Sequence, residues 1–329
     1  MSNKPPIGVP QGAIRLNTDS HKLEFYAQDQ WYEMATDVPT LDSGARGVIA
    51  GNNPTSNVIQ FFTFPVAGNA TYFGHLCQNR FVGGSGSSRT RGIFMGGDPG
   101  PAARLDDIDF ITISSTGDAQ DFGDLTVARG HGCGNSNQTR CCMMGGSAQS
   151  GNQDVIDYIT TASTGNAVDF GNLLEATEHA AGASSPTRGL VAGGNPGTAN
   201  RIQFITITTL GNSQDFGDLQ ALGDVMMGGG MSSPIRAIFS GNYTATIESV
   251  TIPTLGNSRD FGDMTTSRGI QHSNTDSVRG VISGGNTPGS TNSMEYIQIM
   301  TEGNGVDFGD LVADTANGFD TVSTAHGGL

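Results

Sequence analysis

The chain has 329 residues and a formal net charge of −15, with 31 acidic and 16 basic residues. An acidic surface repels phosphate backbones, so nucleic acid is not expected as a partner. No apolar run reaches the roughly 18 residues of a membrane-spanning helix, and no signal peptide opens the chain. We therefore expect a soluble protein that is made in a cytoplasm and does not insert into a membrane. The 49 glycines, about twice the usual share, indicate many tight turns between short strands.

Residues 1–45 are expected to form a small β meander. Three short apolar stretches, at 12–16, 22–26 and 30–34, alternate with polar turn residues. So short a segment buries little core alone, so it should pack on a partner or on copies of itself. Its candidate docking residues are Phe25, Tyr26, Trp31 and Tyr32.

The segments Gly-Ala-Ile-Arg-Leu-Asn-Thr-Asp, Lys-Leu-Glu-Phe-Tyr and Gln-Trp-Tyr lie within residues 12–32. This pattern resembles the short N-terminal module of structural proteins in tailed bacteriophages, most familiar in tail and virion-appendage proteins of phages of marine bacteria and cyanobacteria. The resemblance implies that residues 1–45 attach the chain to other virion proteins of the tail or baseplate.

From residue 46 onward the chain repeats one pattern. Its marker, Gly-Asn-x-x-Asp-Phe-Gly-Asp-Leu, recurs in five close copies and one decayed copy, 45 to 49 residues apart. A period of about 40 to 50 residues is typical of propellers and solenoids. Asp-Phe-Gly also occurs in protein kinases, but only once and beside motifs that this chain lacks, which excludes a kinase. The marker phenylalanines are Phe73, Phe122, Phe170, Phe216, Phe261 and Phe308.

Each repeat contains the same four parts. An apolar run closed by Gly-Gly indicates a strand buried on both faces. In the best preserved repeat the next strand alternates Ile202 and Phe204 with polar Gln203 and Thr206, which indicates a half-buried strand. The Asp-Phe-Gly part adds a strand with an aromatic anchor, and a weaker strand precedes each apolar run. Four-stranded units that cannot bury both faces alone predict blades packed around an axis.

We therefore predict an all-β protein with a six-bladed β-propeller at residues 46–329. The blades should begin near residues 46, 91, 140, 188, 236 and 279. The first repeat lacks the weak strand, and residues 317–324 match that strand in kind. The C-terminal strand is therefore expected to complete blade one and close the ring.

The order of the parts resembles kelch-type blades, in which an apolar strand ends in Gly-Gly, an aromatic-containing strand follows, and a large aromatic marks the outer strand. Kelch blades usually carry Trp where this chain carries Phe, so it departs from the strict kelch pattern. The same repeats resemble those of propeller-type phage appendage proteins over residues 46–329.

An arginine recurs at one position of every repeat although the chain has few basic residues. Each is expected to bond an Asp or a carbonyl of the neighbouring blade and so to lock blade to blade. A basic rim for phosphate or sulfated sugar is the alternative. These arginines are Arg46, Arg91, Arg140, Arg188, Arg236 and Arg279.

Cys77, Cys133, Cys141 and Cys142 match no zinc pattern. The favoured interpretation is that they are small apolar core thiols made in a reducing compartment.

Two other sets of residues are candidate metal ligands, and neither is favoured. His131, His179, His272 and His326 fall near the weak strand, where the axis would lie, but only the first two share a position in their repeats. Aspartates three apart in a strand face opposite sides, so turn capping and solvation explain them better than calcium. No metal and no other cofactor is therefore expected. The aspartate pairs are Asp121/Asp124, Asp215/Asp218, Asp260/Asp263 and Asp307/Asp310.

The loops after Gly-Gly differ from repeat to repeat and are rich in Asn, Gly, Pro, Ser and Thr. On a rigid scaffold such loops carry recognition, and these side chains suit a hydroxyl-rich ligand such as a surface polysaccharide. The loops span residues 52–57, 98–106, 147–154, 195–200, 242–246 and 286–293. The candidate receptor residues are Asn52, Asp98, Asn195, Tyr243 and Asn286.

Together these features predict a non-enzymatic structural component of a phage particle, located in the virion. It would be a tail fibre or tail appendage that presents a propeller to a host-surface glycan or protein. Homo-oligomerisation through the meander is a further expectation. The alternatives are a polysaccharide depolymerase on the same scaffold, which needs acidic residues that converge in one cleft, a head decoration protein, and a cytosolic adaptor.

Overall fold

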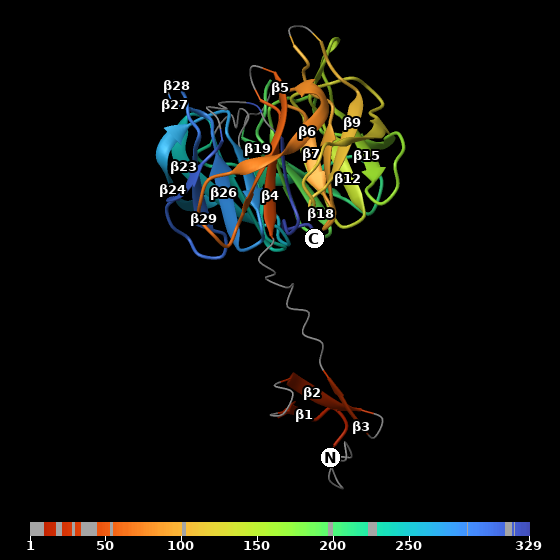
Figure 1. Ribbon diagram of the computed structural model, residues 1–329, viewed down its shortest axis with the longest axis vertical. Coiled ribbons are helices and arrows are strands. Elements are labelled where there is room, and N and C mark those ends of the chain that lie inside the picture. The colour runs from red at the N-terminus through yellow and green to blue at the C-terminus, as the bar shows by residue number, and fades with distance from the viewer. Residues whose placement is uncertain are drawn as a thin grey trace. The chain divides into compact units, whose positions relative to one another are not determined.

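The computed structural model describes residues 10–17, 22–27, 30–33, 45–52, 55–100, 103–196, 200–222, 229–287, 289–312, 318 and 320–329. The chain divides into two compact units, Met1–Asp42 and Ser43–Leu329. The regular secondary structure of these residues consists of β-strands alone, so the described part of the chain is all-β (Figure 1). Within the same ranges there is no helix with the length and hydropathy needed to cross a lipid bilayer.

The first unit contains a three-stranded antiparallel sheet with β2 in the middle. Two consecutive residues of β2 and two of β3 place aromatic side chains opposite one another: Phe25 faces Tyr32, and Tyr26 faces Trp31. The strands are β1 (Ile14–Asn17), β2 (Lys22–Ala27) and β3 (Gln30–Glu33).

The described part of the second unit forms six four-stranded antiparallel sheets, in which the four strands follow the expected parts of the repeat. Sheet 1 consists of β31 (Asp320–Ser323), β4 (Arg46–Ala50), β5 (Ser56–Thr63) and β6 (Thr71–Arg80). Sheet 2 consists of β7 (Gly84–Ser87), β8 (Arg91–Met95), β9 (Asp107–Thr112) and β10 (Gln120–Asp124). Sheet 3 consists of β11 (Cys133–Ser136), β12 (Arg140–Met144), β15 (Val155–Thr160) and β16 (Val168–Asn172).

Sheet 4 consists of β17 (Ala181–Ser184), β18 (Arg188–Ala192), β19 (Arg201–Thr206) and β20 (Gln214–Asp218). Sheet 5 consists of β21 (Gly229–Ser232), β22 (Arg236–Ser240), β23 (Thr244–Thr251) and β24 (Arg259–Arg268). Sheet 6 consists of β25 (His272–Thr275), β26 (Arg279–Ser283), β29 (Ser293–Gln298) and β30 (Val306–Asp310).

The first strand of sheet 1 comes from the far end of the chain. β31 pairs antiparallel with β4, so that Asp320 faces Ala50 and Ser323 faces Gly47. The first strands also contact one another from sheet to sheet: β7 contacts β31 and β11, β17 contacts β11 and β21, and β25 contacts β21 and β31.

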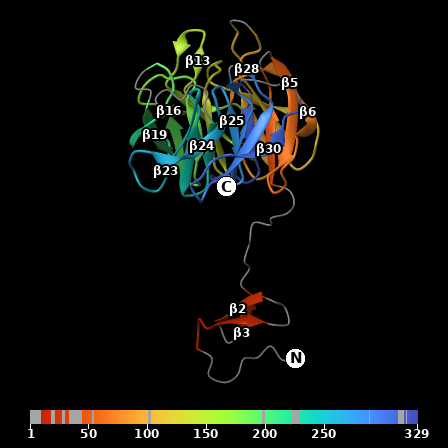
Figure 2. The same ribbon diagram turned by 90° about the vertical axis from the view of Figure 1, so that its left-hand side faces the viewer.

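Two loops between second and third strands contain short hairpins that the sequence did not predict. They are formed by β13 (Ser147–Ala148) with β14 (Gly151–Asn152), and by β27 (Asn286–Thr287) with β28 (Gly289–Ser290). Both views show the β28 hairpin at the opposite end of the sheets from the C-terminus, and Figure 2 shows β13 there as well. We call the end that carries these loops the loop end.

The second strands are buried on both faces because each sheet packs against a sheet on either side. Cys141 packs with Ile93 of sheet 2, whereas the next residue, Cys142, packs with Val191 of sheet 4. Similar apolar clusters join the remaining neighbours, including sheet 6 to sheet 1. Each fully buried aliphatic or aromatic side chain contributes about 1.5–3 kcal/mol, so these clusters are the main source of stability.

The prediction of half-buried third strands is wrong. Four consecutive residues of β19, including Gln203, are buried. Sheets on both sides cover the strand, so its polar residue must find a partner inside. The Gln203 Oε1 atom accepts hydrogen bonds from the backbone N–H of Leu174 (3.0 Å) and from Ser213 Oγ (2.7 Å).

The prediction of four core thiols is wrong for one of them. Cys133, Cys141 and Cys142 are buried, but Cys77 is exposed. It lies on β6, at a position that faces outward from the fourth strand. All four thiols are free, and partial burial beside Asp109 raises the pKa of Cys77 to about 11.

Each repeated arginine bonds a backbone carbonyl of the following sheet. Arg140 Nη1 donates to Ile207 O of sheet 4 (2.9 Å), and Arg279 Nη1 donates to Phe64 O of sheet 1 (2.8 Å). The other four make the same contact with their own neighbours. The Arg140 guanidinium also lies over the ring of Tyr158 in its own sheet, 4.8 Å from its centroid, which adds a cation–π contact.

The repeated marker is a clasp between consecutive sheets. Gly165 N donates to Phe122 O (2.7 Å), and Asn166 Oδ1 accepts from Asp124 N (3.2 Å). Gly123 has φ of 147°, and a Cβ on it would lie 2.5 Å from the Gly165 carbonyl. The Gly-Asn half of one marker therefore fits the Phe-Gly-Asp half of the preceding one, which explains why both halves recur together.

The clasp is present at every junction, with one conservative change. Asp310 N of sheet 6 donates to Asn69 of sheet 1 (3.1 Å). Between sheets 1 and 2, where Asp118 stands in place of the marker's Asn, His75 N donates to Asp118 Oδ1 instead (3.0 Å). We refer to the six arginine bonds and the six clasps together as the frame.

Candidate functional site

The loop end brings together two kinds of connection. The loops between second and third strands start there, and the chain passes there from a fourth strand into the next first strand. Isolated bridges continue the pairing of the first and second strands within one sheet, as in Phe81 with Asp98 and Glu178 with Asn195. Residues of neighbouring sheets also meet at this end, where the sequences differ most: His131 N, before β11, donates to Val82 O, before β7 (2.7 Å).

The predicted receptor residues separate into two groups. Asn195 and Tyr243 are exposed, and Asn286 is half-buried. Asn52 and Asp98 are buried instead; Asn52 N donates to Arg80 O (3.2 Å), and Asp98 pairs with Phe81. Asp98 uses its carboxylate inside the protein, on His131 (3.0 Å) and on Arg104 (2.9 Å).

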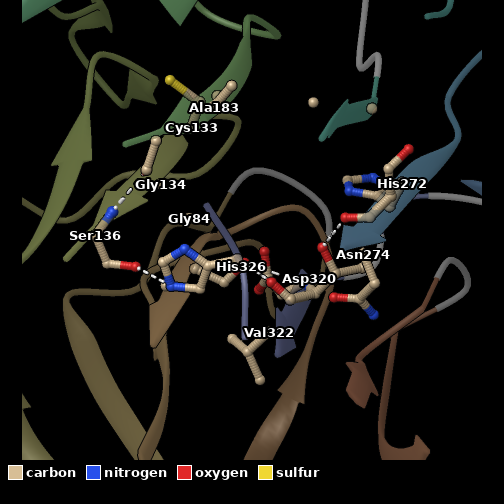
Figure 3. A pocket seen from close by; sticks show the side chains of 18 of the residues that line it. Gly84, Cys133, Gly134, Ser136, Ala183, His272, Asn274, Asp320, Val322 and His326 are labelled. Atoms are coloured by element: carbon tan, nitrogen blue, oxygen red, sulfur yellow. Dashed lines mark hydrogen bonds between the residues drawn. The ribbon is translucent and has the colours of Figure 1, made fainter. Parts of the chain in front are cut away.

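A polar cavity of about 120 Å³ lies between the first strands (Figure 3). Glycine and serine supply most of its wall, since all six first strands contribute small residues. Its titratable lining residues are His131, His179, His272, His326, Asp320 and Cys133. The four histidines, which were predicted to lie near the axis, thus line this cavity.

Asp320 is the acidic residue in the described lining of the cavity. Burial raises the pKa of Asp320 to about 7, although Arg80 and a hydrogen bond from Gly83 N oppose the shift. Burial lowers the pKa of His272 to about 4 and that of His326 to about 4. At neutral pH His272 and His326 are therefore neutral and Asp320 is partly ionised.

The segment after β31 fills the cavity at the end away from the loops. His326 Nε2 lies 3.0 Å from Ser136 Oγ and 3.1 Å from Ser87 O (Figure 3). A Cβ on Gly327 would lie 2.6 Å from Ser184 O, so the chain there touches the cavity wall. His326 thus belongs to this closing segment and not to a first strand.

Metal-ligating side chains converge at one place among the described residues. One donor atom from each of His131, Glu178 and His179 lies within 4.8 Å of the others. The aspartates of the marker, such as Asp121 and Asp124, are exposed on the fourth strands and belong to no such group.

The sequence missed a set of buried acidic residues on the third strands. Asp109, Asp157, Glu248 and Glu295 are each no more than 1% exposed. They accept hydrogen bonds from backbone N–H groups of the preceding sheet, as Glu248 does from Leu222 N (2.9 Å). The signal was a polar residue that follows a large apolar one in each third strand, with a second large apolar residue after it in every case except Glu248; this pattern is also that of a half-buried strand.

Three of these acids also pair with a buried arginine from the preceding sheet. The N···O distances are 2.6 Å for Arg80–Asp109, 2.9 Å for Arg129–Asp157 and 2.7 Å for Arg268–Glu295. All six side chains are at most 1% exposed. Such pairs lock the loop ends of sheets 1 and 2, 2 and 3, and 5 and 6.

In the first unit the four candidate docking residues form two cross-strand pairs. Phe25 stacks on Tyr32 with centroids 5.5 Å apart, and Tyr26 packs on Trp31 at 5.4 Å. Tyr26 is buried, whereas the other three are half-buried. Arg15 lies over the Trp31 ring, 4.2 Å from its centroid.

Comparison with known proteins adds no assignment. No family model matches the chain, and no curated protein matches it.

Proposed function

We propose that the second unit is a closed, kelch-like six-bladed β-propeller that presents its loop end for binding and catalyses no reaction. Four observations support closure, since each passes from sheet 6 back to sheet 1. They are the apolar cluster around Val281 and Ile49, the Arg279 bond, the Asp310–Asn69 clasp and the contact of β25 with β31.

The observation that carries the binding role is the contrast between frame and loops. Arginine bonds and clasps recur at every junction, whereas the loops differ in length and two have their own hairpins. A rigid scaffold with divergent loops at one end is the usual arrangement of a recognition protein. Exposed Asn195 and Tyr243 are the residues that we assign to contact with a host-surface glycan or protein.

We further propose that the chain is a virion component, a tail fibre or tail appendage, attached to tail or baseplate proteins through residues 1–45. This part rests on the resemblance of residues 12–32 to the phage module. The separate compact unit and its half-buried aromatic pairs support a docking role.

A depolymerase is the weaker candidate. Glycoside cleavage needs two carboxyl groups that flank one bond, and among the described residues the cavity wall offers Asp320 alone. Incubation of the full chain with host polysaccharide should release no reducing sugar. Release of sugar that is lost on Asp320→Asn would replace the binding proposal with the enzymatic one.

The location is tested by a density map of the intact particle and by mass spectrometry of purified particles. The chain should be found at the tail, with six sectors around one axis. Its presence on the head would support decoration, and its absence from particles would support an adaptor. An open rod or another number of sectors would overturn the architecture.

A further inference from the structure

Two histidines face each other at the loop-end mouth of the cavity. His131 precedes β11 and His179 precedes β17, and His179 N donates to His131 O (2.8 Å). Their Nδ1 atoms are 3.2 Å apart, and their ring centroids are 4.3 Å apart. Both have positive φ, but so do Val82 and Ile270 at the same position of other sheets. The positive φ is therefore a common feature of the repeats, whereas among the described residues the two histidine side chains occur only at this junction.

A carboxylate faces the other nitrogen of each ring. His131 Nε2 is 3.0 Å from Asp98 Oδ2, and His179 Nε2 is 3.7 Å from Glu178 Oε2. At His131 this carboxylate favours the tautomer that carries its proton on Nε2, which leaves a lone pair on Nδ1, whereas Glu178 lies beyond hydrogen-bond distance of His179. The Nδ1 atoms of the two rings share one small space. Two nitrogens bound to one tetrahedral zinc ion lie about 3.3 Å apart, close to the separation found here.

The local charge also favours a cation. Asp98 and Glu178 carry two negative charges, and Arg104, which pairs with Asp98 at 2.9 Å, returns one positive charge.

We propose that His131 and His179 bind a divalent transition ion of the zinc type through their Nδ1 atoms, with Glu178 as the third ligand. Imidazole with carboxylate suits zinc and its neighbours, whereas calcium and magnesium prefer oxygen ligands alone. The three residues are half-buried at the cavity mouth, so the fourth ligand is water. Asp98 is a positioning residue that holds His131.

The ion ties sheet 3 to sheet 4 beside the recognition loops. Glu178 bridges to Asn195, at the start of one variable loop, and Asp98 starts another. Metal binding would therefore hold the starting points of two variable loops, one of which carries Asn195 of the proposed receptor contact. The site itself does not depend on that function.

The test is zinc binding to the full chain after treatment with a chelator and dialysis. Titration calorimetry and metal analysis should give one zinc per chain. His179→Asn should weaken binding at least 100-fold, about the effect of losing one of few ligands, and Asn accepts the positive φ of this position. Asp98→Asn should weaken binding about 10- to 100-fold without changing the stoichiometry.

His75→Asn is the matched control, because His75 is an exposed histidine on β6, away from the cavity. It should leave zinc affinity unchanged. Zinc should also shift the Nδ1 resonances of two histidines in the long-range proton–nitrogen spectrum of the wild-type chain, a readout that needs no variant. Absence of saturable binding, affinity unaffected by His179→Asn, or unshifted Nδ1 resonances would each overturn the proposal.

Discussion

The junctions between consecutive sheets are alike in the frame and unlike at the loop end. In the frame an arginine bonds a carbonyl, and a Gly-Asn turn fits a Phe-Gly-Asp strand, at every junction. At the loop end three junctions contain a buried ion pair, whereas Gln203 and Glu248 replace it with hydrogen bonds at two others. The residues that repeat are therefore those that hold consecutive sheets together. The loop end tolerates change as long as each buried polar group keeps a partner within its own junction.

The largest effect should come from breaking one loop-end ion pair. Arg129→Thr leaves Asp157 buried without its cation and should lower the free energy of unfolding by about 3–5 kcal/mol. Urea unfolding monitored by circular dichroism measures it.

The chain supplies its own control for this variant. At the equivalent positions of the next junction lie Thr177 and Gln203, which are both buried. The double variant Arg129→Thr/Asp157→Gln copies that arrangement and should recover most of the lost stability. If it is no more stable than the single variant, the junctions are not interchangeable.

The cavity should give a pH-dependent effect, because the Asp320 pKa is about 7 in the folded chain and about 3.9 when unfolded. The folded state therefore binds the proton more tightly. The stabilising contribution of Asp320 is complete below about pH 4 and is lost as the pH rises to about 7, by up to about 4 kcal/mol.

Asp320→Asn isolates this contribution, since the other titrating groups cancel in the comparison. Relative to the variant, metal-free wild-type protein should lose unfolding free energy steadily from about pH 4 to about pH 7. A difference that does not vary with pH would show that Asp320 titrates normally.

The clasp should respond to a smaller change. Gly171 has φ of 147°, and a Cβ there would lie 2.6 Å from the Gly211 backbone. We expect Gly171→Ala to cost about 2–4 kcal/mol through strain and forced separation of the sheets. Gly211→Ala is the matched control, since it has the same φ and no atom within 4 Å of the added Cβ. Equal losses of thermal stability in the two variants would argue against the interlock.

The smallest effect on stability should come from the loops. Tyr243 is half exposed and has φ of 56°, which Asn accepts. Tyr243→Asn should change the unfolding free energy by less than about 1 kcal/mol but weaken attachment to host cells several-fold. Tyr72→Asn, which changes an equally exposed tyrosine on β6, should leave attachment unchanged in the same pull-down assay.

The repeat made the strands and the six arginines predictable, because identical packing demands identical residues at a fixed step. The apolar runs closed by Gly-Gly or by a single glycine located all the second strands. The role of Gly165-Asn166 was not predictable, since its partner lies one repeat earlier along the chain. Sequence periodicity gives the position of a residue and does not give its contact.

The loop end was harder to predict for a related reason. Polar residues such as Asp157 and Gln203 alternate with apolar ones, as in an exposed strand. The neighbouring sheet covers these residues, and the spacing of apolar residues along the chain does not indicate that a second sheet is present. His131 and His179 lie at the same position of their repeats. The carboxylates beside them, Asp98 and Glu178, lie at different positions of their repeats, so the repeat did not predict this cluster.

The pairing of β31 with β4 has a consequence for synthesis. Asp320 faces Ala50, so β4 must wait for about 270 further residues before that edge is covered. At about 5–20 residues per second this delay is tens of seconds. During this delay the uncovered edge of β4 can pair with the same edge of β4 in another nascent chain. Crowded translation on one messenger should therefore favour domain-swapped aggregates, and slower initiation should suppress them.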